Sequence, residues 1–293
     1  MIIIHLEGGL GNQLFQYAVA RYLSNKYNVV LKYDDSACMV NVNRPLRLNL
    51  FKIRATRADA EDIASFKDAN KFRNKIINWI ETKFQLPYYK RRIVQEPHYH
   101  FSADFFKIKK DAYLQGYWQS EKYFYDIRDI LLNELTLKFD PDRDNKKHLK
   151  DIINSESVSI HVRRGDYVKN PHTRAYHGIC SLDYYKRALK KIGSLVENPK
   201  YYVFSDDPDW TKENLKIKGK VVFIINNSNK EYEDLRLMRA CKHNIIANST
   251  FSWWGAWLGE YKNKIVIAPE KWFLTKENNY KDIVPDRWLK IPN

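Results

Sequence analysis

Two adjacent arginines, Arg163 and Arg164, end a stretch beginning at Ser157 in which apolar and polar residues alternate. A period of two predicts a strand. Gly165 and Asp166 follow directly, so a sharp turn should gather both guanidinium groups at the carboxyl end of this strand, the edge where open α/β sheets bind ligands. Guanidinium groups bind phosphate through paired hydrogen bonds. These residues favour a phosphorylated ligand; the alternative is that the arginines pair with Asp166 and other surface carboxylates.

Two further predicted strands also end in polar residues. Asp206 and Asp207 follow the strand that begins at Lys200, and Asn248 and Ser249 follow a later one. Hydroxyl groups at a helix N-terminus cap the helix, and they also contact phosphate when an anion is present. Because the carboxyl ends of parallel strands share one edge, a nucleotide cleft is the interpretation that accounts for all three strand ends.

A glycine-rich segment near the N-terminus is a second candidate for phosphate binding. Gly8, Gly9 and Gly11 separate a short apolar strand from helical spacing that begins at Leu14. Such a junction lets the backbone approach a ligand and points helix amides at it. The spacing matches neither the dinucleotide-binding pattern nor the Walker loop. A tight structural turn is the alternative.

The Asp207-Pro-Asp209 segment suggests a competing metal site. Asp-x-Asp pairs hold divalent ions on diphosphates because such ions prefer hard oxygen ligands. Arg163 and Arg164 already supply positive charge, so the chemistry does not require a metal. We therefore expect neither a metal site nor a cofactor.

The chain has 293 residues, enough for two domains. The charged segment from Lys138 to Asn154 is the candidate linker, which predicts domains over residues 1–145 and 146–293. No apolar run approaches the ~20 residues that span a bilayer, and the start lacks a basic signal region, so we expect a cytoplasmic protein. Strands and helices alternate in the second half, a pattern typical of a parallel α/β sheet. The predicted strands there cover residues 157–163, 200–205, 220–225, 244–247 and 264–268.

The net charge of +15 indicates an anionic partner, which could be nucleic acid, a membrane surface or a nucleotide-bearing substrate. The polar residues concentrate at strand ends and no aromatic RNA-recognition motif is present, so we do not expect nucleic-acid binding. Residues 70–92 combine an apolar helical face, including Phe72 and Ile76, with many basic residues. We favour packing of that face on its own domain; peripheral docking on the inner face of the membrane is the alternative.

Several segments together resemble the bacterial α-1,2-fucosyltransferase family. The His-x-Arg-Arg-x-Asp element occurs more widely among GDP-fucose enzymes, whereas its combination with the last segment is specific. The resemblance implies an α/β fold of GT-B architecture, with two Rossmann-like domains facing across a cleft and GDP-β-L-fucose held mainly by the second. The matching segments span nearly the whole chain and are Gly8–Ala18, Gly116–Ser120, His161–Tyr167, Val203–Asp207 and Asp234–Leu258.

The resemblance also implies the donor contacts, residue by residue. Arg163 would contact the β-phosphate, His161 the guanosine portion and Asp206 the guanine. Tyr117 and Trp118 are the candidate acceptor contacts. The other implied donor-binding residues are Gly9, Asn12 and Gln13 in the first domain and Arg164, Asn248, Ser249, Thr250 and Phe251 in the second.

The implied reaction is an inverting transfer of fucose to O2 of a terminal galactose in an oligosaccharide or lipid-linked glycan. Arg163 would stabilise the charge on the departing GDP. Asp166 and Glu7 are candidate general bases, although Asp166 could equally orient Arg163, and a dissociative transition state would need no strong base. A transferase with a different donor, acceptor or linkage stays the alternative. The sequence indicates no oligomeric state.

Overall fold

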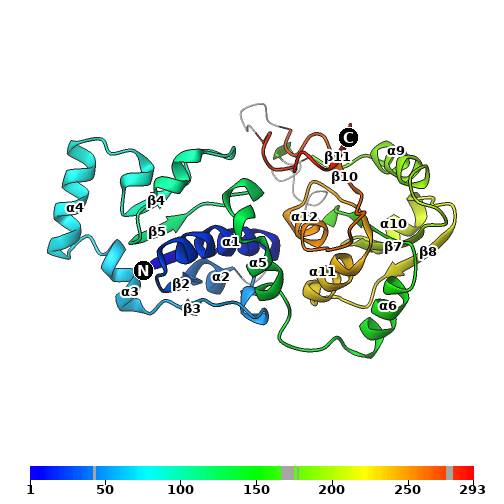
Figure 1. Cartoon of the computed structure of the whole chain (residues 1–293), viewed down its shortest axis with the longest axis horizontal. Helices are drawn as coiled ribbons and strands as arrows, with labels where there is room; N and C mark the ends of the chain where they lie inside the picture. The colour runs from blue at the N-terminus through cyan, green and yellow to red at the C-terminus, as the bar shows by residue number, and fades with distance from the viewer. Residues whose placement is uncertain (42–43, 166–174, 177, 275–279) are drawn as a thin grey trace. The chain divides into compact units, whose positions relative to one another are not determined.

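The computed structural model describes residues 1–41, 44–165, 175–176, 178–274 and 280–293. These residues form two compact α/β units (Figure 1). Unit 1 comprises Met1–Lys138 and Lys281–Ile283, and unit 2 comprises Phe139–Tyr280 and Val284–Asn293. The chain therefore divides after Lys138, whereas Asn145, at the predicted boundary, lies within a helix of unit 2.

Unit 1 is built on a five-stranded parallel sheet with the order β3-β2-β1-β5-β4. Its strands are β1 (Ile2–His5), β2 (Leu31–Asp34), β3 (Thr56–Arg57), β4 (Ile93–Gln95) and β5 (Ala112–Gln115). Its α-helices are α1 (Leu10–Tyr27), α2 (Ser36–Val40), α3 (Ala60–Lys67), α4 (Phe72–Lys83) and α5 (Arg128–Glu134).

Helix α1 follows β1 and is buried along most of its length. The Tyr17 hydroxyl donates to the Glu134 carboxylate at 2.5 Å, and Arg21 Nε lies 2.9 Å from the same carboxylate. A buried charge is tolerated when it is paired and hydrogen-bonded, so this cluster ties α1 to α5. The glycine-rich turn at the start of α1 is consequently held at the carboxyl end of β1.

Unit 2 contains a six-stranded parallel sheet with the order β11-β10-β9-β6-β7-β8. Its strands are β6 (Ser157–Val162), β7 (Lys200–Ser205), β8 (Lys220–Ile224), β9 (His243–Ile245), β10 (Val266–Pro269) and β11 (Leu289–Ile291). Its helices are α6 (Arg143–Ile153), α9 (Leu182–Gly193), α10 (Pro208–Asn214), α11 (Glu231–Ala240) and α12 (Thr250–Trp257). The five strands predicted in this half are confirmed to within two residues at each end.

Helices cover both faces of this sheet (Figure 1). Tyr184 and Ile192 of α9 pack with Val158 and Ile160 on one face, while Leu237 of α11 packs on the other. The alternating residues of β6 predicted one apolar and one polar face, yet every residue of this strand is buried. A central parallel strand is enclosed on both sides, so its polar residues need internal partners.

The segment expected to be a linker contains helix α6. The Asp142 side chain caps this helix by accepting a hydrogen bond from the Asn145 backbone N–H at 3.0 Å. Leu149 and Ile152 then pack into the apolar cluster around Phe204. The linker interpretation was therefore wrong for these residues, because two apolar residues three apart are enough to anchor a helix whose other positions are charged. No helix in the described part of the chain is long and apolar enough to cross a membrane.

Candidate active site

The carboxyl ends of β6 and β7 bring the predicted arginines next to the predicted aspartates. The two strands pair in register up to Val162 and Ser205, so the residues that follow lie side by side. Arg163 Nη1 is 3.0 Å from Asp206 Oδ2, and the Arg164 backbone N–H donates to Asp206 Oδ1 at 2.8 Å. Asp206 therefore engages both residues of the arginine pair and fixes the turn that carries them.

Arg164 has its own carboxylate and an aromatic support. Its Nε lies 3.3 Å from Asp207 Oδ2, and its guanidinium carbon lies 3.3 Å from the centre of the Trp210 ring. Guanidinium groups stack on aromatic faces in this way, which holds the side chain in one orientation. The pairing considered as the alternative for the arginines is thus present, with Asp206 and Asp207 as partners. No sequence pattern had singled out Trp210.

Two carboxylates near this turn were candidates from the sequence, Asp166 as a base and Asp207 as a metal ligand. Asp166, a candidate base, lies outside the described residues. Asp207, part of the proposed Asp-x-Asp metal site, is instead paired with Arg164. Within the described ranges, no group of three His, Cys, Asp or Glu side chains is placed to hold a metal ion.

His161 lies on β6, two residues before Arg163, and is buried. Burial lowers the pKa of its imidazole to about 4, so the ring is neutral at physiological pH. The ring centre lies 5.6 Å from that of Phe251, and its buried Nδ1 atom has no hydrogen-bond partner among the described residues. An unsatisfied buried nitrogen costs free energy, so this atom is a candidate for contact with a ligand.

The predicted residues between β9 and α12 separate into two kinds. Asn248 is fully buried, and its side chain donates to Gly178 O at 3.4 Å and to Trp272 O at 3.3 Å, so it connects loops of the fold. Ser249 is the N-cap residue of α12, but its side chain does not cap the helix. Thr250 and Phe251 form the first turn of α12 and are half-buried. A ligand could therefore reach the backbone at the N-terminal end of α12 and the side chains of Thr250 and Phe251.

Asp234, in the first turn of α11, is a candidate that sequence reasoning missed. Burial raises the pKa of its carboxyl to about 7, against the opposing effect of the Asn227 amide, which donates to it at 2.7 Å. Asn227 is held in turn by Asn145 at 2.9 Å. Asp234 begins one of the family segments, but an acidic residue in a first helical turn normally stabilises the helix dipole, so it was not singled out as a site residue. Its half-buried position in the helix that follows β8 makes it a candidate for a hydrogen bond to a ligand.

In unit 1, the glycine-rich turn is fixed by neighbouring amides. Gly8 has φ +77°, and a Cβ atom there would lie 2.6 Å from Asn12 Nδ2. The Asn12 side chain accepts a hydrogen bond from Gln119 at 3.2 Å. Gln13 is fully buried and donates to Gly8 O and Pro45 O, both at 3.0 Å. The Gln13 side chain thus fixes the conformation of the turn. Gly9, the N-cap residue of α1, has no side chain and can offer only backbone groups to a ligand.

A pair of carboxylates lies at the same edge of the unit 1 sheet. Burial, followed by the negative charge of Glu7, raises the pKa of the Tyr117 hydroxyl to about 12. Glu96, which follows β4, accepts from the backbone N–H groups of Tyr117 at 2.7 Å and Trp118 at 3.0 Å. Burial raises the pKa of Glu96 to about 7. Glu96 lies in an irregular stretch before Pro97, where no sequence pattern indicated a role.

Trp118, predicted to contact the acceptor, has a solvent exposure of 0%. Its ring packs against those of Phe105 and Tyr123, with centres 5.4 and 5.6 Å away. A ring enclosed in this aromatic cluster is a core element and offers no surface to a sugar. Tyr117, which is half-buried, is the member of the predicted acceptor pair that a ligand could touch.

The sequence model of Glycosyl transferase family 11 matches residues 1–291. The chain belongs to this family. It is 36% identical to the O-antigen biosynthesis glycosyltransferase WbnK of Escherichia coli, over 98% of this chain and 99% of that protein. It is 34% identical to an alpha-1,2-colitosyltransferase of Escherichia coli, over 99% of both chains.

Among solved structures, the fold is similar to that of the fucosyltransferase NodZ from Bradyrhizobium. The TM-score is 0.51 at 13% sequence identity, with 90% of this chain and 95% of that chain covered. The predicted membership of the α-1,2-fucosyltransferase family and the predicted α/β fold of GT-B architecture are both confirmed. The family 11 chain is therefore a glycosyltransferase, and the two sheet edges described above are its candidate catalytic surfaces.

Proposed function

We propose that this family 11 enzyme is an inverting galactoside α-1,2-fucosyltransferase. It would transfer L-fucose from GDP-β-L-fucose to O2 of a terminal galactose in an oligosaccharide or a lipid-linked glycan. The observation that carries the proposal is the arginine pair at the carboxyl end of β6, where Asp206 holds Arg163 at 3.0 Å. The family match and the similarity to a glycosyltransferase and to a fucosyltransferase support the nucleotide-sugar donor.

In this proposal, each residue of the unit 2 edge has a separate task. Arg163 stabilises the negative charge that develops on the β-phosphate as the bond from C1 of fucose to the phosphate oxygen breaks. Asp206 positions Arg163 and Arg164, since both of its oxygens already accept from them. The neutral ring of His161 can donate or accept one hydrogen bond to the nucleotide without adding charge.

The acceptor side of the reaction needs a nucleophile and a proton acceptor. O2 of galactose would attack C1 from the face opposite the departing GDP, so the β-linked donor becomes an α-linked product. The hydroxyl proton would pass to a carboxylate, for which Glu7 and Asp166 are the candidates. Glu7 is partly exposed, and its negative charge contributes to the raised pKa of the Tyr117 hydroxyl, so the two side chains are neighbours.

The similarity to one relative makes a colitose donor the second candidate. The alpha-1,2-colitosyltransferase is 34% identical over 99% of both chains. Colitose is fucose without the 3-hydroxyl group, so a single hydroxyl distinguishes the two donors. A site that hydrogen-bonds this hydroxyl discriminates strongly against the deoxy sugar, whereas an apolar site does not. The ratio of kcat/KM for the two GDP-sugars would therefore identify the natural donor.

The proposed activity can be tested with purified protein in EDTA. The enzyme is incubated with GDP-fucose and galactose-terminated oligosaccharides, GDP release is followed, and the product linkage is read by NMR. The proposal predicts an α-fucosyl group on O2 of galactose, formed without added metal. Formation of a β-linked product, transfer to another position, or no turnover with GDP-fucose while another GDP-sugar is used would reject it.

A further inference from the structure

Helix α4 of unit 1 turns its apolar side chains outward. We define the α4 ridge as five residues whose side chains are exposed, with fractions of 78% for Phe72, 43% for Ile76, 58% for Trp79, 38% for Ile80 and 63% for Phe84. Phe72, Ile76 and Trp79 are four and three residues apart, so they share one side of the helix. Exposed contiguous apolar side chains on a surface helix indicate an interaction site.

The inner side of α4 is attached to unit 1 by polar groups instead. Asn74 is buried, and its side chain donates to Asp68 O at 2.9 Å and accepts from Arg92 Nη1 at 3.0 Å. Glu81 accepts from the Arg92 backbone N–H at 2.7 Å. The amphipathic helix is thus inverted relative to the usual arrangement in a globular domain. Our expectation that its apolar face packs on its own domain was wrong.

The charge around the α4 ridge is mostly positive, although Asp111 pairs with Arg73 at 3.6 Å and with Arg92 at 3.2 Å. Residues 71–92 contain seven basic side chains and one acidic side chain. The acidic residue, Glu81, is on the inner side and is bonded to Arg92. Lys83 contacts the α4 ridge, since its Nζ lies 4.5 Å from the centre of the Trp79 ring. The basic residues are Lys71, Arg73, Lys75, Lys83, Lys90, Arg91 and Arg92.

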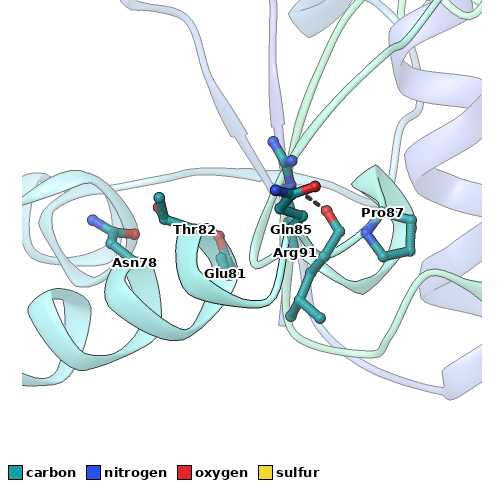
Figure 2. A pocket seen from close by; sticks show the side chains of 7 residues that line it. Asn78, Glu81, Thr82, Gln85, Pro87 and Arg91 are labelled. Carbon is teal, nitrogen blue, oxygen red and sulfur yellow. Dashed lines mark hydrogen bonds between the residues drawn. The ribbon is translucent and has the colours of Figure 1, made fainter.

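A polar groove adjoins the C-terminal end of the helix. Figure 2 shows Asn78, Glu81 and Thr82 along one flank of α4 and Gln85, Pro87 and Arg91 in the chain that follows. The groove has a volume of about 670 Å³, and Arg91 Nε at its wall donates to Leu86 O at 2.8 Å. Amide, hydroxyl and guanidinium groups thus stand beside the C-terminal end of α4, together with the carboxylate of Glu81, which the Arg92 backbone N–H already occupies.

We propose that α4 docks this enzyme on an anionic phospholipid surface. The α4 ridge enters the boundary between headgroups and acyl chains, and the surrounding lysines and arginines contact the lipid phosphates. A helix with an apolar face and basic flanks lies in the plane of the interface, and each basic residue near an anionic surface adds to binding. A second copy of this chain would carry the same positive charge, which opposes self-association through this face. The proposal does not depend on the identity of the donor or acceptor.

The test is co-sedimentation of the full chain with vesicles of phosphatidylcholine alone or mixed with phosphatidylglycerol. We expect binding to the anionic vesicles only, weakening with added salt. Phe72→Ser/Ile76→Ser removes apolar ridge area, and Lys75→Glu/Lys83→Glu reverses two charges. Each variant should reduce the partition coefficient at least about tenfold. Since these side chains are exposed, circular dichroism should show unchanged folding.

Matched controls change the same residue types elsewhere. Val30→Ser/Leu195→Ser removes two exposed apolar side chains, and Lys216→Glu/Lys218→Glu reverses two exposed lysines. Both controls should bind anionic vesicles within about twofold of the parent, because none of these residues belongs to α4 or to its basic flanks. If the controls lose binding as strongly as the ridge variants, net charge alone is responsible and the proposal is overturned.

Trp79 offers an independent signal, because it is the exposed one among eight tryptophans, all of which lie in described residues. Anionic vesicles should shift its fluorescence to the blue, brominated lipid should quench it, and Trp79→Phe should remove the signal. Failure to bind anionic vesicles, or binding that the ridge variants leave unchanged, overturns the proposal. Concentration-dependent dimerisation that the ridge variants abolish, without vesicle binding, would overturn it in favour of a second copy.

Discussion

The carboxyl edges of the two parallel sheets differ in how charge is held. In unit 2, the cations of Arg163 and Arg164 are matched by Asp206 and Asp207, and the imidazole beside them is neutral. In unit 1, the edge carries the carboxylates of Glu7 and Glu96, and burial raises the pKa of Glu96 to about 7. Similar parallel sheets thus present arginines held by aspartates in one unit and, in the other, two carboxylates without such arginine partners among the residues that the structure describes.

The proposed mechanism assigns a different task to each edge. A guanidinium group that is already oriented stabilises a developing phosphate charge without reorganising during the reaction. A partly exposed carboxylate suits removal of a proton from a hydroxyl. If either edge proved dispensable for catalysis, this assignment of tasks would be wrong.

The largest effect is expected at the unit 2 edge. Arg163→Ala should reduce turnover about 10²–10³-fold, because it removes the group proposed to stabilise the leaving phosphate and leaves Asp206 without that partner. Arg163→Lys should recover little activity, since an ammonium group lacks the planar donor pair. Steady-state kinetics with GDP-fucose measures both. Arg187→Ala, at an exposed arginine of α9, is the control and should keep full activity.

Substitution of the carboxylates at the unit 1 edge should lower kcat. Glu7→Gln keeps the size of the side chain but removes its basicity, so kcat should fall about 10²-fold or more while GDP affinity is unchanged. Glu96→Gln keeps an acceptor for the Tyr117 and Trp118 backbone N–H groups and should have a smaller effect. Equal kcat in the parent and Glu7→Gln would remove Glu7 from the mechanism.

The neutral state of His161 predicts a pH dependence of stability. Its pKa falls from an ordinary value of 6.5 to about 4 on folding. Between these values the unfolded chain binds a proton that the folded chain does not, so the free energy of unfolding decreases as the pH falls from about 6.5 to about 4. Between pH 6.5 and 5 the loss should be about 2 kcal/mol.

Urea unfolding of the parent and of His161→Gln isolates this effect, since the variant lacks the titrating ring. The raised pKa values of Asp234 and Glu96 act in the opposite direction, because the folded chain then holds protons that the unfolded chain loses between about pH 4 and 7. These carboxyl groups remain in both proteins, so they cancel in the difference. An identical pH dependence in parent and variant would contradict a neutral His161.

The smallest effect concerns the shape of the unit 1 turn. Gly8→Ala should destabilise the fold by about 1–2 kcal/mol, because an alanine at φ +77° is strained and its Cβ meets Asn12. Gly193→Ala in α9 is the control, since its Cβ would lie 3.8 Å from the Tyr201 hydroxyl, and it should stabilise by about 0.4–1 kcal/mol. Chemical denaturation compares the two, and an unaffected Gly8→Ala would show that the turn does not need a left-handed residue.

Much of the fold could be predicted because the local pattern and the tertiary structure agree. The apolar runs of β6 to β10 and the polar residues after them indicated both the sheet and the edge where Arg163 meets Asp206. The family motifs supplied the rest, since they span nearly the whole chain.

The failures come from interactions that a linear pattern does not contain. Trp118 was expected to contact the acceptor, but the rings of Phe105 and Tyr123 enclose it in an aromatic cluster. Helix α4 shows the expected amphipathic spacing, yet Asn74 and Glu81 decide which side faces the domain. Glu96 and Asp234 are carboxylates whose raised pKa values come mainly from burial, which depends on long-range packing.

The most direct test of the central claim is calorimetric titration with GDP in EDTA, with UDP as the competitor nucleotide. We predict that GDP binds without metal, that UDP binds much more weakly, and that Arg163→Ala loses GDP binding while Arg187→Ala retains it. Binding that appears only with magnesium or manganese would contradict an arginine-held diphosphate. Absence of GDP binding under both conditions, in protein with intact folding, would contradict the proposed donor site itself.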